Sequence, residues 1–110
     1  MLSASCHCGA VSLEISLKPR QLTDCNCSIC RRYGALWAYY RSGGVAFEGP
    51  TTVYAWGRRR VGFHRCRSCG CIVGWLPLGE DFGHCAVNAR MLDGFDAEAV
   101  TRIVEEDASS

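Results

Sequence analysis

Residues 66–71, Cys66-Arg67-Ser68-Cys69-Gly70-Cys71, contain the motif that most strongly indicates a metal-stabilised fold. A C-x-x-C pair suits two sulfur ligands of one tetrahedral zinc ion, because the turn points both side chains inward. The same turn leaves its backbone amides free to hydrogen-bond the thiolates. Gly70 directly after Cys69 suits such a turn, where a positive φ is often needed. One such pair is weak evidence for a metal site.

Two more cysteine groups precede this stretch, Cys6-His7-Cys8 and Cys25-Asn26-Cys27-Ser28-Ile29-Cys30, and Cys85 stands apart. Three groups in one short chain are strong evidence for zinc. A closed structural site takes four protein ligands, whereas a catalytic site keeps an open position with three. A C-x-C pair with a C-x-x-C pair makes a four-thiolate site, and the remaining group offers three thiolates. Spacing leaves other partitions open: Cys30 could join the first site, or His7 or His64 could supply a nitrogen.

The cysteine count also indicates the compartment. Nine cysteines in 110 residues fit poorly with a fully paired disulfide framework, because the number is odd. No segment approaches the ~20 apolar residues of a membrane span, and the N-terminus lacks the features of a signal peptide. We therefore expect a cytoplasmic protein, in which clustered cysteines bind metal or do thiol chemistry.

The length of the chain predicts one domain, which the cysteines indicate to be zinc-binding, over residues 1–110, with 1–4 and 107–110 frayed.

Charge is balanced overall and uneven along the chain. The net charge of +1 argues against a polycationic nucleic-acid binder. Residues 1–79 carry a net +7 and residues 80–110 a net −6, and 11 of the 12 cations are arginine. Arginine matches carboxylates and phosphates. The N-terminal part therefore either forms a pocket for a small anionic ligand or is a solvated surface.

Short strands with regular breaks predict an all-β domain. Residues 10–17 alternate between apolar and polar side chains, as a half-buried strand does. Helical signals are sparse, with one or two turns expected over Ser28–Tyr33 and another after Asp96. The other expected strands are Leu36–Arg41, Val45–Glu48, Thr51–Trp56, Arg60–Arg65, Ile72–Leu76, Cys85–Asn88 and Thr101–Glu106.

A family resemblance emerges from these motifs. Cys6-x-Cys8-Gly9-x-Val11, then Cys25-Asn26-Cys27-Ser28-x-Cys30-Arg31, then Phe63-His64-x-Cys66-x-x-Cys69-Gly70 and the late Leu92-Asp93-Gly94 resemble the glutathione-dependent formaldehyde-activating enzymes, a family that includes centromere protein V. The resemblance implies a mainly antiparallel, zinc-bound all-β fold called a β-tent, similar to that of type B methionine sulfoxide reductases, with at most one or two short helices. It also implies a structural zinc on Cys6, Cys8, Cys66 and Cys69, and a second, labile zinc on Cys25, Cys27 and Cys30.

The implied activity is that of a carbon–sulfur lyase joining glutathione, or a related thiol, to formaldehyde or another small aldehyde. Arg31 and Arg32 lie within one helical turn of the open site and could meet a substrate carboxylate. One rival interpretation is a thiol-based reductase of the methionine sulfoxide type that uses Cys85. Another is a non-enzymatic scaffold or binding module held together by zinc. If such a module bound nucleic acid, Arg58–Arg60 beside Trp56 would make the contact. We do not expect nucleic acid as a partner. The sequence leaves the oligomeric state open.

Overall fold

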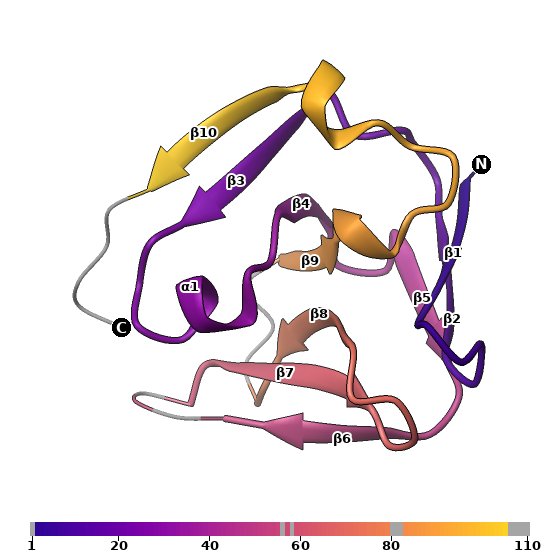
Figure 1. Cartoon of the computed structure of the whole chain (residues 1–110). Coiled ribbons are helices and arrows are strands. Elements are labelled where there is room, and N and C mark those ends of the chain that lie inside the picture. Colours follow the sequence, from indigo (N-terminus) through magenta and orange to yellow (C-terminus); the bar gives the residue numbers. More distant parts are fainter. Residues whose placement is uncertain (1, 56, 58, 80–82, 106–110) are drawn as a thin grey trace.

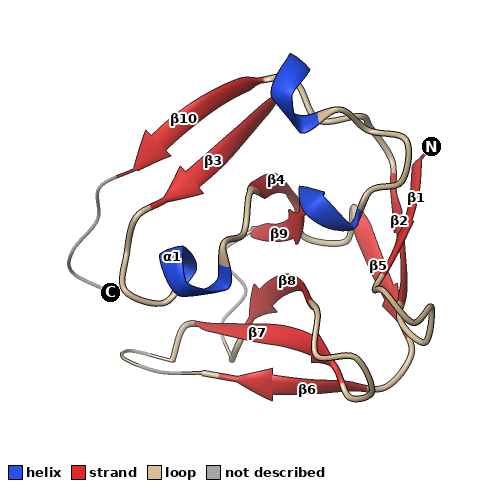
Figure 2. Cartoon of the chain, viewed as in Figure 1, coloured by secondary structure: helices blue, strands red, loops and turns tan. Residues whose placement is uncertain are grey.

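The computed structural model describes residues 2–55, 57, 59–79 and 83–105, which fold as two β-sheets with short helical turns. Figure 1 shows a small sheet of β1, β2 and β5 standing beside a larger, strongly curved sheet. The predicted architecture, mainly antiparallel β with little helix, is confirmed (Figure 2). Among the described residues, no helix is long and apolar enough to cross a membrane.

The small sheet contains β1 (Leu2–Ser5), β2 (Ser12–Ile15) and β5 (Val45–Glu48), all antiparallel. The alternation predicted for residues 10–17 is present in β2, where Leu13 and Ile15 are buried and the residues between them are exposed. The expectation that residues 1–4 fray is wrong for 2–4. These residues pair with β2 along the whole strand, and Ala4 is buried. Residues 107–110 lie outside the described part.

The large sheet has the strand order β10-β3-β4-β9-β8-β7-β6. Six of its seven strands follow the sequence prediction closely, and the predicted ends of β6 and β10, Trp56 and Glu106, lie outside the described residues. The bounds are β3 Gln21–Cys25, β4 Trp37–Arg41, β6 Thr51–Tyr54, β7 Val61–Cys66, β8 Ile72–Pro77, β9 His84–Asn88 and β10 Thr101–Glu105.

Strand β3 is absent from the prediction and makes the one parallel pairing among the described strands, with β10. Its buried residues do not alternate with exposed ones, since Leu22 and Thr23 are neighbours and both are buried. The partner strand comes from the far end of the chain, so no local signal indicates the pairing. Figure 1 shows β10 and β3 side by side, with β10 at the sheet edge.

Helical structure is confined to single turns. The predicted turn at Ser28–Tyr33 is α1 (Cys30–Tyr33), which ends at Gly34 in the left-handed conformation. The predicted N-cap Asp96 accepts a hydrogen bond from the backbone of Glu98 and caps a 3-10 turn, η2 (Ala97–Ala99). A second 3-10 turn, η1 (Ala89–Met91), follows β9.

The central strands of the large sheet carry buried residues on both faces. One face packs against the small sheet, where Leu13 and Ile15 meet Ala38 and Val87. The opposite face buries Trp37, Phe63 and Ala86 together with two cysteines from the β3–α1 region. The two cysteine groups therefore belong to two different apolar clusters.

Candidate metal centres

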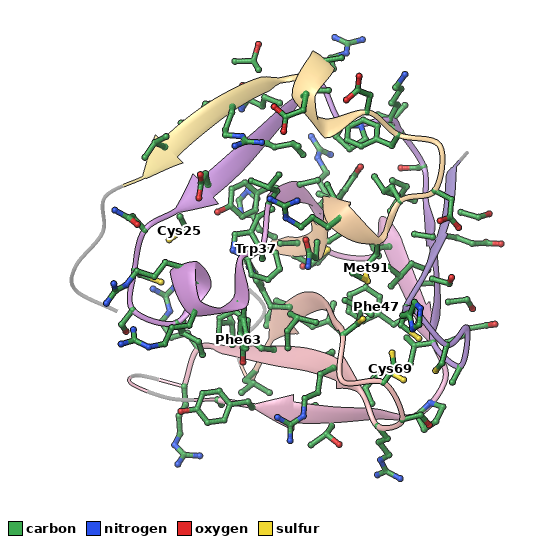
Figure 3. The ribbon with its side chains drawn as sticks, in the orientation of Figure 1. Cys25, Trp37, Phe47, Phe63, Cys69 and Met91 are labelled. Carbon is green, nitrogen blue, oxygen red and sulfur yellow. The ribbon has the colours of Figure 1, made fainter. Side chains whose placement is uncertain are left out.

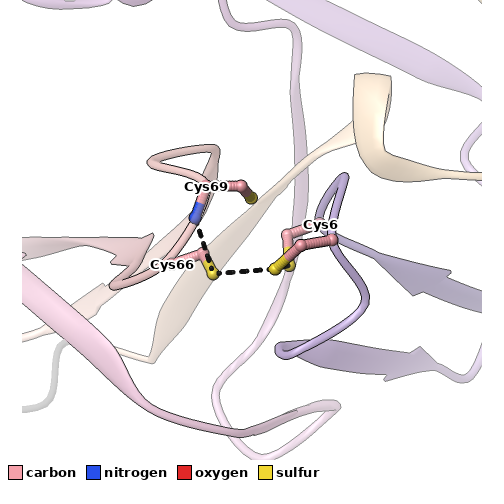
Figure 4. Close-up of side chains that lie close together, drawn as sticks. Cys6, Cys66 and Cys69 are labelled. Carbon is pink, nitrogen blue, oxygen red and sulfur yellow. Dashed lines mark hydrogen bonds between the residues drawn. The ribbon is translucent and has the colours of Figure 1, made fainter.

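Four cysteines from the two sheets converge at one point. Cys6 and Cys8 lie in the turn after β1, Cys66 ends β7, and Cys69 lies in the turn to β8. Their sulfur atoms all lie within 4.8 Å of one another, with Cys6 Sγ 3.7 Å from Cys8 Sγ and Cys8 Sγ 3.6 Å from Cys66 Sγ. Figure 4 shows the labelled side chains pointing toward a common centre.

Backbone amides surround this group, as expected around thiolates. Val11 N–H donates to Cys6 Sγ at 3.3 Å, and the N–H groups of Ser68 and Cys69 donate to Cys66 Sγ at 3.3 and 3.4 Å. Gly70 adopts φ +79°, and its N–H bonds to the Cys66 carbonyl at 3.0 Å, which closes the turn. The turn geometry predicted from C-x-x-C-G is therefore present.

These amides change the acidity of the thiols. Backbone N–H groups of Cys71 and Cys8 lower the pKa of Cys69 to about 5. At Cys8 the Ala10 N–H acts in the same direction, but the hydrogen bond to Cys66 and burial outweigh it and raise the pKa to about 11. Without metal, the group thus combines a readily ionised thiol with one that keeps its proton.

The second group consists of the sulfurs of Cys25, Cys27 and Cys30, which lie within 4.8 Å of one another. Cys25 ends β3 and Cys30 begins α1, so one tight connection positions all three. Cys27 and Cys30 are only 3% and 7% exposed, whereas Cys25 is half-buried. The backbone N–H of Cys30 donates to Cys27 Sγ at 3.4 Å.

Aromatic side chains cover this second group. The indole N–H of Trp37, at the start of β4, donates to Cys30 Sγ at 3.3 Å. Phe63 packs against Trp37 and also against Tyr33, with ring centroids 6.0 and 5.5 Å away (Figure 3). Burial raises the pKa of both Cys25 and Cys30.

Both groups fit zinc by their donor chemistry and spacing. A tetrahedron of sulfurs about 2.3 Å from zinc has edges of about 3.8 Å. The distances of 3.7 and 3.6 Å in the four-cysteine group agree with these edges. The three-cysteine group would leave one of four positions open. Both groups could hold a metal ion.

The arginines predicted at the second group lie on α1, directly after Cys30. Arg31 and Arg32 are exposed on α1, and the Arg32 guanidinium donates to the carbonyl of Ser28 at 2.6 Å. Trp37, which lies in the predicted strand Leu36–Arg41, makes a contact that the sequence did not indicate. It lies seven residues after Cys30, and only the turn at Gly34 brings the two together.

The other candidate residues, two histidines and two cysteines, belong to neither cysteine group. His7 is exposed, and His64 Nδ1 lies 3.0 Å from Thr51 Oγ1 with its ring edge-on to Phe47. Cys85 is 1% exposed and bonds the Arg41 carbonyl, which does not suit an attacking nucleophile. Cys71 is only partly buried beside the four-cysteine group.

Comparison with known proteins defines the class. The sequence model of the glutathione-dependent formaldehyde-activating enzymes matches residues 1–103, so the chain belongs to this family. A crystal structure of a Rhodobacter sphaeroides protein, solved as a structural-genomics target, superposes with a TM-score of 0.80 at 28% identity. The match covers 94% of this chain and 98% of that chain. No curated protein matches the chain.

Proposed function

We propose that this protein is a zinc-dependent enzyme of the carbon–sulfur lyase type, acting through the three-cysteine group. It would add glutathione, or a related thiol, to formaldehyde or another small aldehyde. The sulfur forms a bond to the carbonyl carbon, the C=O double bond opens, and the thiol proton ends on the oxygen. The observation that carries the proposal is the set of three sulfurs within 4.8 Å, separate from a complete set of four.

Cys25, Cys27 and Cys30 would hold the ion and leave one position open. When bound, zinc supplies a stabilised thiolate and polarisation of a carbonyl. Cys27 and Cys30 are buried beneath Trp37 and Phe63, so the chain limits water on that side. The half-buried Cys25 marks the side from which a substrate can approach.

Trp37 has a positioning role in this proposal. Its indole N–H fixes the Cys30 sulfur and withdraws electron density from it. Three thiolates leave a bound Zn²⁺ with net charge −1, which weakens its attraction for an incoming carbonyl. A hydrogen bond to one sulfur reduces that effect.

One experiment tests this proposed function, which the family assignment and the geometry support. Zinc per chain is measured under reducing conditions for wild type, Cys27→Ala and Cys85→Ala, and glutathione–formaldehyde exchange is followed by NMR. We expect two zinc ions in wild type and in Cys85→Ala, with faster exchange than in buffer. We expect Cys27→Ala to keep one ion and lose the acceleration.

Cys85→Ala is the matched control, because it removes a buried thiol that belongs to neither group. One tightly held zinc in wild type and no rate effect would contradict the enzyme and favour a zinc-stabilised binding module.

A further inference from the structure

An open cavity of about 1050 Å³ lies where β3 and β4 separate. The two strands pair at a single position, Thr23 with Trp37, and beyond it the loop between β2 and β3 forms the opposite wall. The hydroxyl of Tyr40 donates to the carbonyl of Leu17 at 2.8 Å, which ties this loop to β4. The volume of the cavity suits a small organic molecule rather than a single simple ion.

The charges around this cavity have one sign. Its lining includes Lys18, Arg20 and Arg41 and no aspartate or glutamate. In the described part of the chain, the one ion pair joins Arg102 to Glu98, so none of the three cations forms an ion pair with a described carboxylate. Clefts lined by one sign of charge concentrate ligands of the opposite sign. These three cations are part of the excess of positive charge in residues 1–79.

The cavity lies next to the three-cysteine group. Thr23 lines it two residues before Cys25, and its partner Trp37 bonds Cys30. Tyr39, which is 46% exposed and also lines it, shares a face with Trp37 because alternate residues of a strand point the same way. Ala38 and Tyr40, which point to the opposite face, also line it, so the cavity extends along the edge of β4 between the two faces.

We propose that this cavity binds a small organic molecule carrying two or more carboxylates, held by Lys18, Arg20 and Arg41. Arginine forks on opposite walls match carboxylates several ångströms apart. The ligand is either an acidic peptide or a free polycarboxylate. Its identification as the acidic part of the thiol substrate rests on the proposed function, whereas its binding does not.

The test uses the full, zinc-loaded chain and two probes without a free thiol, S-methylglutathione and tricarballylate. Amide shifts are followed by NMR at constant ionic strength in chloride. We expect saturable shifts confined to residues 16–23 and 38–44, with a dissociation constant on the order of 1 mM. The double variant Arg20→Glu/Arg41→Glu should weaken binding at least about tenfold.

Arg65→Glu is the matched control, since Arg65 is exposed on β7 and does not line the cavity. It should leave the affinity unchanged. Binding of S-methylglutathione alone would support a peptide ligand, and binding of tricarballylate alone a free polycarboxylate. Shifts that do not saturate, that spread over the surface, or that weaken equally in both variants would overturn the proposal. Retained binding in Cys27→Ala with lost exchange activity would separate this site from the reaction.

Discussion

Trp37 is the residue on which the three-cysteine group depends most outside its own sulfurs. It is 1% exposed, packs on Phe63, and donates its one polar hydrogen to Cys30 Sγ. The sequence predicts a strand over Leu36–Arg41, and this tryptophan begins that strand in the structure. Its hydrogen bond could not be predicted, because it depends on how the chain turns between α1 and β4.

Replacing Trp37 with phenylalanine tests this contact. Trp37→Phe keeps an aromatic ring and removes the donor to Cys30, so the second metal should bind about 3- to 10-fold more weakly. Competition with a chromophoric chelator measures the affinity, and the sulfur-to-cobalt absorption of the cobalt-loaded protein should shift. Trp75→Phe, whose ring contacts Tyr39, is the control and should change neither. An unchanged spectrum in Trp37→Phe would mean that the bond has no influence on the sulfur.

The thiols also predict how metal binding depends on pH. Burial raises the pKa of Cys25 and Cys30, so both thiols are protonated in the metal-free protein at neutral pH. A metal ion must displace these protons, and affinity at this group should therefore rise with pH across the neutral range. Calorimetry in buffers of different ionisation enthalpy counts the protons released, and we expect at least two. A pH-independent affinity would contradict the protonated state.

At the scale of elements, Gly74 in β8 allows the two sheets to approach. A Cβ at this position would meet the carbonyl oxygen of Ala86 and would lie 2.7 Å from Phe47 Cζ. Phe47 belongs to β5 of the small sheet, so only glycine permits this close contact. The sequence predicts that Gly74 lies in a strand, Ile72–Leu76, but does not indicate its contact with the small sheet.

Gly74→Ala should therefore destabilise the fold by about 2–4 kcal/mol. Urea unfolding of the zinc-loaded protein measures the change. Gly44→Ala is the control, because its nearest contact, the Arg41 carbonyl oxygen, is 3.1 Å away and can adjust. We expect less than about 1 kcal/mol there. Equal effects of the two substitutions would show that the sheets can move apart at β8.

For the whole molecule, the four-cysteine group links the two sheets. Cys6 and Cys8 follow β1 of the small sheet, while Cys66 and Cys69 join β7 and β8 of the large one. The three-cysteine group lies within one segment, between β3 and α1. We propose that the chain folds as a single zinc-binding domain whose stability depends mainly on the first group.

Loss of one sulfur from each group should have unequal effects. Cys66→Ser should remove most of the folded protein, because structural zinc contributes on the order of 10 kcal/mol. Cys27→Ala should fold and lower Tm by only a few degrees. Circular dichroism and calorimetry with and without a chelator measure both variants. A Cys66→Ser protein that melts like wild type would mean that apolar contacts alone hold the sheets together.

From the sequence alone, alternation indicated the β-rich class and most strands, whereas cysteine spacing left several ligand sets open and only the family resemblance implied the sets of four and three. Alternation and C-x-x-C spacing are local properties, and a folded chain preserves them. Tertiary structure alone decided the rest. The parallel pairing of β3 with β10 and the cavity with Lys18, Arg20 and Arg41 join segments distant in the chain, and the bond from Trp37 to Cys30 depends on the turn at Gly34 between α1 and β4. Such contacts depend on how strands order themselves in a sheet, which no window of sequence contains.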